Sequence, residues 1–401
     1  AVRQCAVQWV AEEKLARLRP GVEAVFQSDA ITSDLFVSSL AALEMLDGVN
    51  PADIDKTPAS QYVSPLLADA KRPVGVRVQA LRLVSPRDAA LTTELFNSLW
   101  NSGDATLRRE ALRTWQGGKA VEIRSRLLAL AADTASDPGL RLEGVLALAT
   151  LAAGGAEAGP ARQQLVKLLH DENPVIVIEA LRGLRGVPAG EGVSRTDLDR
   201  LIDRLKQIPG EPSPAERELA DQVALVLGGW KLPIPPAIEQ LATPRLNSQE
   251  EWVASLSRGR AADAESGRRV FYSPAGPGCV KCHTVNGRGG KVGPDLSRVA
   301  DTMNRLQLMQ SILDPSGEIA PQFVAWTMET RDGKTVTGMI VHENEGKTVL
   351  GNAEGQTVEL KTAEIVERVP QKTSVMPEKL FERMTVQEMR DVLAFLEGKK
   401  R

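Results

Sequence analysis

The sequence has few aromatic residues, little net charge and no long apolar segment. Aromatic side chains make up 4% of the 401 residues, which favours helices packed through leucine, alanine and valine. The longest apolar run, around Val145–Ala153, is far shorter than the ~20 residues that span a bilayer, so we predict no membrane span in this chain. The formal net charge of −3 gives no indication of a nucleic-acid partner. A hydrophobic content of 42% is that of a globular protein with a real core, and the length predicts two or three domains.

Cysteine is also scarce, with three residues in the whole chain. Cys279 and Cys282 belong to one short motif, so Cys5 has no further cysteine with which to form an intrachain disulfide. Disulfide content therefore says nothing about the compartment of the protein. Cys5 occupies a position in a helical pattern, and we expect it to be a small core residue.

The most informative feature is the motif C-x-x-C-H at Cys279, Cys282 and His283, which is typical of covalent attachment of haem c. Two thiols three positions apart can each add across one vinyl group of the same porphyrin. The histidine that follows is then held beneath the iron as its proximal ligand. The motif predicts one covalent haem c and an electron carrier, and we predict no catalytic residue in this chain.

Covalent attachment of haem also indicates where the protein matures. In bacteria this reaction takes place outside the cytoplasmic membrane, so we predict an exported protein. Residues 1–20 show neither a basic segment leading into an apolar stretch nor a small-residue cleavage site. We therefore expect the chain to be the C-terminal part of a longer protein.

The first 207 residues contain a repeated pattern, V-R-x-x-A-L and its variants. Five copies begin at Val2, Val76, Leu107, Leu140 and Ile176, and a weaker copy covers Leu35–Leu40. From Leu81 the last apolar position recurs after 31, 33 and 36 residues, a period typical of stacked helix pairs. The pattern resembles the PBS-lyase HEAT-like repeats and predicts a HEAT-like α-solenoid over residues 1–207. Two interpretations stay open: a scaffold and spacer, or a concave face on which a partner protein docks.

A proline-rich segment, residues 208–260, separates the repeats from the C-terminal part. Its prolines are Pro209, Pro212, Pro214, Pro233, Pro235, Pro236 and Pro244. A short helical pattern runs through residues 215–227. The density of proline predicts a semi-stiff connection.

Residues 261–401 combine two helical patterns with an insertion of strands. Residues 261–271 and 385–396 have helical periodicity and lie near the two ends. Between them, residues 321–370 are rich in β-branched side chains and turn signals. The runs 323–330, 335–341, 348–350 and 357–360 predict a small antiparallel β insertion. Its role is either a structural cap or a docking surface for a partner.

The arrangement of these features around C-x-x-C-H resembles a class I-type cytochrome c domain, so the fold class we predict is mainly α. The resemblance implies that the first and last helices cross where Gly267 meets Phe395, because a residue without a side chain permits close approach. It also implies that the carbonyl of Pro294 accepts the Nδ1 proton of His283 and fixes the tautomer of the proximal ligand.

The same resemblance implies a sixth ligand far along the chain. Such cytochromes place a distal methionine shortly before the last helix, where this sequence has Met376 within Ser374–Pro377. A thioether ligand favours the ferrous state and raises the reduction potential relative to a second histidine. His342, or no sixth ligand, are the alternatives, and we expect His342 to be exposed at a strand end.

Basic side chains are frequent near the motif. They are Arg268, Arg269, Lys281, Arg288 and Lys291. They either surround the exposed haem edge, where one could pair with a propionate, or form a solvated basic face.

Several motifs follow one another in a fixed order along the chain. They are the HEAT-like repeats, C-x-x-C-H, Gly293–Leu296, Ser311–Ser316, the β insertion and Ser374–Pro377. In this order they resemble a bacterial family of haem-binding-domain proteins, in which a HEAT array precedes one c-type cytochrome. Members often carry an upstream dehydrogenase-like β-propeller similar to quinoprotein sugar dehydrogenases. The resemblance implies a periplasmic protein whose haem receives electrons from such a fused domain or from a redox partner protein, with any dehydrogenase activity outside this chain.

Other classes of protein compete with the electron carrier. A structural zinc site would use Cys279, Cys282 and His283, but zinc takes four tetrahedral ligands and the sequence offers no second pair. A thioredoxin-like dithiol requires a βαβ pattern, which the flanking sequence lacks. A haem c protein with an open distal side would be a peroxidase or a sensor, and only Met376 argues against it. A pure interaction scaffold is the remaining alternative for residues 1–207.

Overall fold

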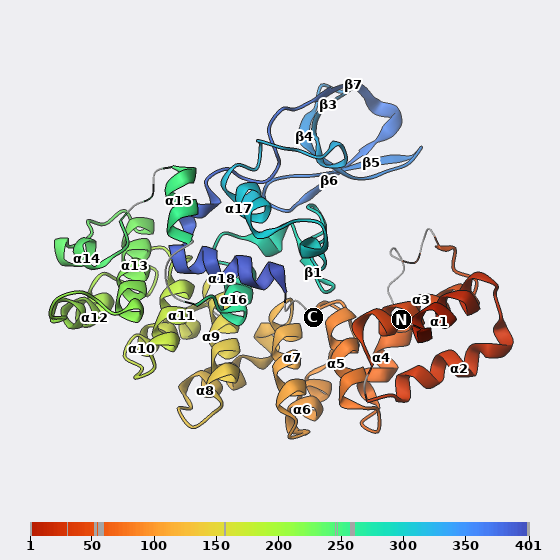
Figure 1. The fold of residues 1–401 in the computed structure, drawn as a ribbon, viewed down its shortest axis with the longest axis horizontal. Helices are drawn as coiled ribbons and strands as arrows, with labels where there is room; N and C mark the ends of the chain where they lie inside the picture. The colour runs from red at the N-terminus through yellow and green to blue at the C-terminus, as the bar shows by residue number, and fades with distance from the viewer. Residues whose placement is uncertain are drawn as a thin grey trace. The chain divides into compact units, whose positions relative to one another are not determined.

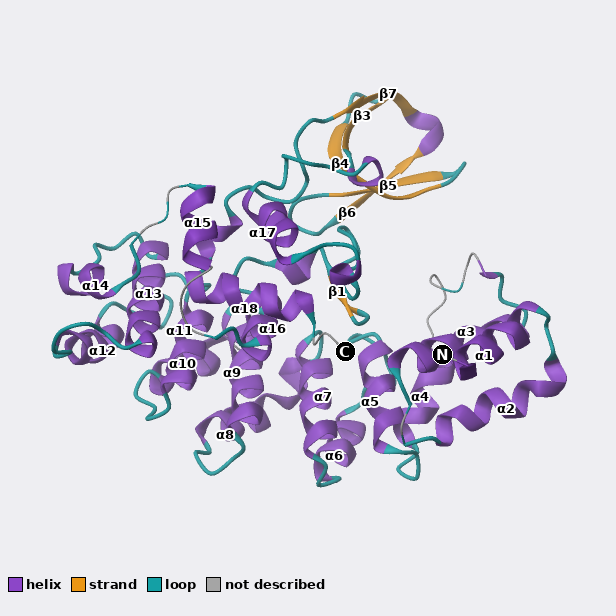
Figure 2. Cartoon of the chain, viewed as in Figure 1, coloured by secondary structure: helices purple, strands orange, loops and turns teal. Residues whose placement is uncertain are grey.

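The computed structural model describes the chain except for a few short segments. The described residues are 2–29, 31–51, 54, 60–155, 158–244, 246, 248–256 and 261–398. They form a mainly helical structure with a small antiparallel sheet, which confirms the mainly α prediction at this level (Figures 1 and 2). Within the described ranges, no helix is both long enough and apolar enough to cross a membrane. Contacts divide the chain into two compact units, residues 1–124 with 286–288 and residues 125–285 with 289–401.

The first unit is built from helices. They are α1 (Val2–Glu12), α2 (Arg19–Ala24), α3 (Ser33–Leu46), α4 (Ser60–Ala68), α5 (Val74–Leu83), α6 (Thr93–Asn101) and α7 (Ala105–Gln116). The sequence repeats that begin at residues 2, 35, 76 and 107 lie in α1, α3, α5 and α7, so one α-helix separates each copy from the next. Each repeat-bearing helix of this unit packs against the following one. Such packing of alternate helices supports the solenoid hypothesis, which stays a prediction.

The expectation for Cys5 is wrong, because this side chain is exposed. Helix α1 packs against α3 and buries Val7, Val10 and Ala11. Cys5 and Trp9 lie four residues apart on another face of the helix, and Trp9 is 55% exposed. A helix can bury one face while the opposite face stays in water, and Cys5 lies on the exposed face.

On α7, the buried carboxylate of Glu110 forms ion pairs with three arginines of the first unit. Its oxygens lie 2.9 Å from Arg113 and 3.4 Å from Arg82. Arg288 approaches to 3.0 Å. Burial opposes ionisation of Glu110, but the three guanidinium groups outweigh it and lower its pKa to about 2. Arg288 therefore belongs to a buried ion pair, which corrects both interpretations offered for it from the sequence.

The second unit continues the helical pattern. Its first helices are α8 (Arg124–Ala132), α9 (Pro138–Ala152), α10 (Ala158–Leu168), α11 (Pro174–Leu184), α12 (Thr196–Lys206), α13 (Pro214–Gly229), α14 (Pro236–Leu241) and α15 (Gln249–Leu256). Asp137 and Asn173 cap α9 and α11, and each cap is followed by a proline in the first turn. The repeats that begin at residues 140 and 176 lie in α9 and α11, which pack against each other. Helix α13 contains the helical pattern seen inside the proline-rich segment, and it packs against α11 as part of the core.

The rest of this unit, residues 261–285 and 289–398, is called the C-terminal module below. Its helices are α16 (Ala264–Tyr272), α17 (Arg305–Leu313) and α18 (Val386–Glu397). Strands β1 (Thr284–Val285) and β2 (Arg288–Gly289) form a short pair. The larger sheet contains β3 (Ala325–Thr330), β4 (Thr335–Glu343), β5 (Lys347–Gly351), β6 (Thr357–Lys361) and β7 (Ile365–Pro370). The helices predicted over 261–271 and 385–396 are confirmed as α16 and α18, which begin after the capping side chains of Asp263 and Thr385.

Helices α16 and α18 pack against each other (Figure 1). At Gly267 they lie so close that any side chain would collide with the backbone carbonyl of Asp391. Gly267 thus lies against the backbone of α18 one turn before Phe395, and its predicted contact with Phe395 stays a prediction. Phe395 packs against Phe271, with ring centroids 5.5 Å apart. The two helices are in backbone contact at Gly267, whereas the packed rings of Phe271 and Phe395 require a wider separation. The two contacts therefore lie one after the other along the helix pair.

The larger sheet has the strand order β6-β5-β4-β3-β7, and all its neighbouring strands are antiparallel (Figure 2). The four runs predicted from the sequence are confirmed as β3, β4, β5 and β6. Strand β7 was not predicted, because it is an edge strand whose side chains are mostly exposed and show no alternation of buried residues. It pairs with β3 and ends at Pro370, a residue that edge strands tolerate.

Two arginines of α16 are buried against the repeat helices. Arg268 pairs with Glu143 on α9, and Arg269 lies 2.9 Å from Glu179 on α11. The two arginines are 8% and 4% exposed, so neither belongs to a haem edge or to a solvated face, contrary to both interpretations from the sequence. Glu143 and Glu179 occupy equivalent positions in two copies of the repeated pattern. The repeat helices thus supply the counter-charges that let α16 be buried.

A second group of buried charges joins the start of α18 to α11 and α13. Oε1 of Glu388 accepts hydrogen bonds from Arg182 at 2.6 Å and from Arg185 at 2.8 Å. Gln222 on α13 donates a third at 2.9 Å. The other oxygen of Glu388 accepts the backbone N–H of Thr385 and completes the capping box of α18. Burial opposes ionisation of Glu388, but Arg185 and Arg182 lower its pKa to about 2.

Replacement of Glu388 with alanine should lower the free energy of unfolding by about 3–5 kcal/mol, because Arg185 would lose the carboxylate of Glu388 and the buried Arg182 would keep only that of Glu179. The matched control is Asp203→Ala, which removes an exposed ion pair with Lys206 and should cost at most about 0.5 kcal/mol. Urea unfolding followed by circular dichroism measures both variants. Equal losses in the two would contradict the buried role of Glu388.

Glu218 on α13 makes stability depend on pH. Both of its carboxyl oxygens lie 3.0 Å from the hydroxyl of Thr385, and Gln222 donates to one of them at 2.8 Å. Burial and the nearby carboxylate of Glu388 raise the pKa of Glu218 from 4.5 to about 8. The folded protein therefore binds this proton more tightly than the unfolded chain does. The stabilising contribution is complete below about pH 4.5 and is lost as the pH rises through about 8.

Between pH 6.5 and pH 8.5, we expect the free energy of unfolding of the wild type to fall by about 2 kcal/mol relative to that of Glu218→Gln, which does not ionise. Burial raises the pKa of the neighbouring Asp221 only to about 6, so this group has mostly lost its proton before the interval begins. Urea unfolding at several pH values measures the difference. Parallel profiles of the two proteins would show that Glu218 does not titrate in this range.

Candidate functional site

The C-x-x-C-H motif forms one tight turn. Cys279–Lys281 make a 3₁₀ turn, and the backbone N–H of His283 donates to the carbonyl of Cys279 at 2.9 Å. In a turn with three residues per revolution, positions i and i+3 lie on the same side. The turn therefore brings Cys279 and Cys282 to one side of the segment, with His283 directly after them.

The imidazole of His283 is held in one tautomer. Its Nδ1 lies 3.0 Å from the carbonyl oxygen of Pro294, the hydrogen bond that the resemblance to cytochromes implied. A carbonyl only accepts, so Nδ1 carries the proton and Nε2 keeps the lone pair that a metal ion needs. Burial lowers the pKa of His283, although the carbonyl of Pro294 opposes this, and the ring is neutral near pH 7.

Gly293 leaves room for the same imidazole. A methyl group at this position would lie 2.7 Å from Cε1 and 2.8 Å from Nδ1 of His283. The N–H of Gly293 also donates to the carbonyl of Cys282 at 2.8 Å. The glycine thus ties the segment that carries Pro294 to the motif and lets it run close past the ring.

Both thiols of the motif are protonated near pH 7. Burial raises the pKa of Cys279 to about 12. Burial also raises the pKa of Cys282, with the ammonium of Lys281 opposing the shift and the carboxylate of Glu354 adding to it. Dithiol oxidoreductases instead need a thiol of lowered pKa.

In the described part of the chain, no three His, Cys, Asp or Glu side chains are grouped so that they could hold a metal ion.

Met376, the predicted sixth ligand, lies in the loop between β7 and α18. Its backbone N–H donates to the hydroxyl of Ser374 at 3.1 Å. The N–H of Ser374 donates in turn to the hydroxyl of Ser316 at 3.2 Å. Sequence reasoning missed this support, although Ser316 ends one of the motifs that carry the family resemblance. The loop is thereby tied to a segment 58 residues earlier, and the role of Met376 as a ligand stays a prediction.

His342, the alternative sixth ligand, is the second-last residue of β4, so its predicted place at a strand end is confirmed. It is half-buried, and its Nε2 is 3.3 Å from Nδ2 of Asn344. The expectation that His342 is exposed is therefore wrong. The side-chain contact with Asn344 engages the nitrogen that a ligand would use.

Two of the five basic residues near the motif are exposed, namely Lys281 and Lys291. The arginines at 268, 269 and 288 are engaged in the buried ion pairs described above. Among these five residues, therefore, only the two lysines present a positive charge to a partner near the motif.

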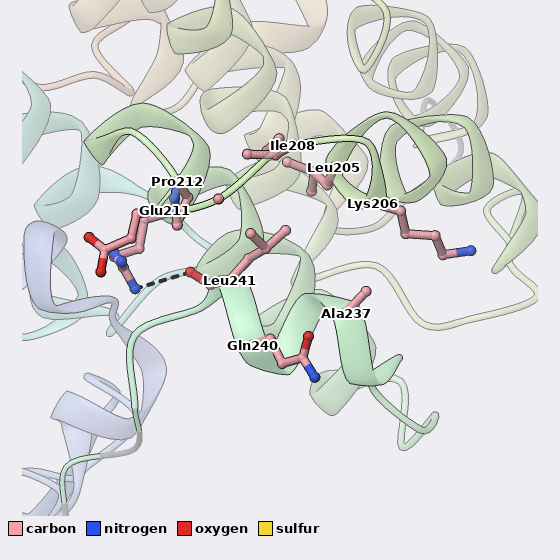
Figure 3. Close-up of a pocket in the computed structure, with 10 residues that line it drawn as sticks. Leu205, Lys206, Ile208, Glu211, Pro212, Ala237, Gln240 and Leu241 are labelled. Atoms are coloured by element: carbon pink, nitrogen blue, oxygen red, sulfur yellow. Dashed lines mark hydrogen bonds between the residues drawn. The ribbon is translucent and has the colours of Figure 1, made fainter.

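A pocket of about 290 Å³ lies between α12, α13 and α14 (Figure 3). Its wall includes Leu205, Ile208 and Leu241, and Arg217 donates to the carbonyl of Leu241 at 3.2 Å. The ten residues that line it include none from the C-x-x-C-H turn or from the loop of Met376. This pocket is therefore separate from the candidate site.

The residues of the C-x-x-C-H turn fit a covalently attached haem. Two neutral thiols lie on one side of a single turn, and one neutral imidazole follows with Nε2 available. Gly293 leaves room for this imidazole beside the segment that carries Pro294. Cys279, Cys282 and His283 are the residues that would hold the group, with Pro294 supporting His283.

No protein-family model matches this chain, and no curated protein matches it significantly.

Gly293→Ala should displace the imidazole of His283, because the added methyl would lie 2.7 Å from Cε1. We expect less haem per protein after maturation and a lower melting temperature of the haem-free chain. Gly159→Ala is the control, since no atom lies within 4 Å of a methyl at this helical position, and alanine favours a helix by about 1 kcal/mol over glycine. Thermal unfolding and the ratio of haem to protein measure both variants. If Gly293→Ala behaves like Gly159→Ala, the contact with the imidazole is not a constraint.

Proposed function

We propose that this protein carries electrons through one haem c, attached to Cys279 and Cys282 and ligated by His283 and Met376. The observation that carries the proposal is the hydrogen bond between Nδ1 of His283 and the carbonyl of Pro294. It fixes an imidazole with a free Nε2 directly beside two thiols that lie on one turn. These are the residues that covalent attachment and proximal ligation require.

Bound haem c supplies a one-electron iron couple. The chain sets the surroundings of that iron: the carbonyl of Pro294 accepts the Nδ1 proton of His283, and Gly293 leaves room for its ring. Met376 would add a soft thioether that favours the ferrous state. Ser374 and Ser316 hold the backbone of Met376 in its loop.

The proposal extends to compartment, architecture and partners. Attachment of haem c outside the cytoplasmic membrane implies an exported, periplasmic protein. A HEAT-like solenoid carrying a class I-type cytochrome domain is the architecture we propose. Electrons would come from a redox partner protein or from a fused dehydrogenase domain, so this chain would act as a carrier rather than as an enzyme.

The geometry also weighs against the competing classes. The raised pKa values of Cys279 and Cys282 are the opposite of what a dithiol oxidoreductase uses. A structural zinc site needs four converging donors, and the described residues offer no such group around the motif. An open distal side, as in a peroxidase or a sensor, differs from the proposal only at Met376.

Protein matured in a host that attaches haem c should keep its haem after acid–acetone extraction. Its ferric spectrum should contain the red-region sulfur-to-iron charge-transfer band, because Met376 supplies a thioether. Met376→Ala should lose this band, and Ser316→Ala should weaken it by loosening the loop. Met309→Leu, which changes a buried methionine of α17, is the control and should keep the band. A colourless protein with unmodified thiols would overturn the haem, and a band that persists in Met376→Ala would overturn the ligand.

A further inference from the structure

The turn between β5 and β6, residues 352–356, lies directly against the C-x-x-C-H segment. Gly355 has φ +77°, and any side chain there would collide with the carbonyl oxygen of Lys281. The same side chain would lie 2.8 Å from the carbonyl carbon and 3.1 Å from Cβ of Lys281. The β insertion thus touches the backbone between the two cysteines of the motif.

A second contact seats the same hairpin. A side chain at Gly351, at the end of β5, would lie 2.5 Å from Cγ1 of Val292. Val292 is buried and immediately precedes Gly293, the residue that packs against His283. The hairpin therefore contacts the chain both within the motif and beside its proximal histidine.

Four hydrogen bonds close this turn. Oδ1 of Asn352 accepts the backbone N–H groups of Glu354 at 3.1 Å and Gln356 at 2.8 Å. The N–H of Asn352 donates to the carbonyl of Gln356 at 2.9 Å, and Gly355 donates to the carbonyl of Asn352 at 3.0 Å. These bonds fix the backbone of residues 352–356. Glu354, which directly precedes Gly355, is thereby kept close to Lys281.

Glu354 adds a negative charge at this place. Its side chain is exposed, and its carboxylate acts electrostatically on Cys282 against the ammonium of Lys281. The oxidised iron of a haem carries one more positive charge than the reduced iron. A fixed carboxylate nearby therefore stabilises the oxidised form and lowers the reduction potential.

We propose that the turn 352–356 is a fixed cover of the haem-attachment segment, and that Glu354 on this turn lowers the reduction potential of the attached haem. The inference rests on the proposed function for its second half, since a potential exists only when haem is bound. Its first half concerns the chain alone. It assigns a role to the β insertion, for which the sequence left a cap and a docking surface open.

Potentiometric titration of the matured protein tests Glu354. Glu354→Gln should shift the midpoint potential to a more positive value, by a two- to tenfold change in the equilibrium constant of reduction, tenfold being about 59 mV for one electron. Glu345→Gln is the matched control, because Glu345 is an exposed glutamate in the turn at the other end of β5. The shift should shrink between low and high ionic strength, since an exposed charge is screened by salt. An unchanged midpoint in Glu354→Gln, in a protein that carries haem, overturns the role of Glu354 and leaves the proposed function standing.

Hydrogen exchange of the protein before haem attachment tests the cover independently. Gly355→Ala should increase exchange of the amides at residues 280–283, because the methyl pushes the turn away from Lys281. Gly333→Ala is the control, since Gly333 also has a left-handed backbone, φ +81°, but no atom lies within 4 Å of an added methyl. Equal exchange at residues 280–283 in the two variants overturns the cover. A protein that takes up no haem at all overturns the proposed function and the role of Glu354 together.

Discussion

Buried arginines tie the C-terminal module to the repeat helices of the second unit. A guanidinium group buried without a carboxylate costs several kcal/mol, and Arg182, Arg268 and Arg269 are all buried. Arg268 and Arg269 pair with carboxylates on α9 and α11, and Arg182 pairs with Glu388 on α18 as well as with Glu179 on its own helix. Separation of the module from these helices would leave charges of both signs without partners, so the ion pairs favour a single arrangement.

This constraint reaches the candidate site through α16 and α18. Helix α16 leads into the C-x-x-C-H turn, and α18 follows the loop of Met376. Both helices are anchored to repeat helices by carboxylates and to each other at Gly267. In the second unit, Glu143 and Glu179 of two repeats form ion pairs with arginines of the C-terminal module. These pairs favour the scaffold interpretation for this part of the repeats.

The β insertion explains the long interval between His283 and Met376. The two residues are 93 positions apart, and the sheet between them reaches back to the motif through the turn after β5. A short hairpin turn contacts Lys281 while the end of β5 contacts Val292. The insertion thus belongs to the immediate surroundings of the site, and its charges act there over short distances.

The sequence alone determined the local features, because each depends on residues near one another in the chain. These include the alternate helices that carry the repeats, four of the five long strands, and the turn with Cys279, Cys282 and His283. Tertiary structure decided which buried charges meet, since Arg269 and Glu179 are 90 residues apart and no local pattern links them. It also decided that Cys5 faces water, that Gly267 lies against the backbone of Asp391, and that Gly355 lies against Lys281. Burial and close approach depend on neighbours distant in sequence, and only the folded chain brings them together.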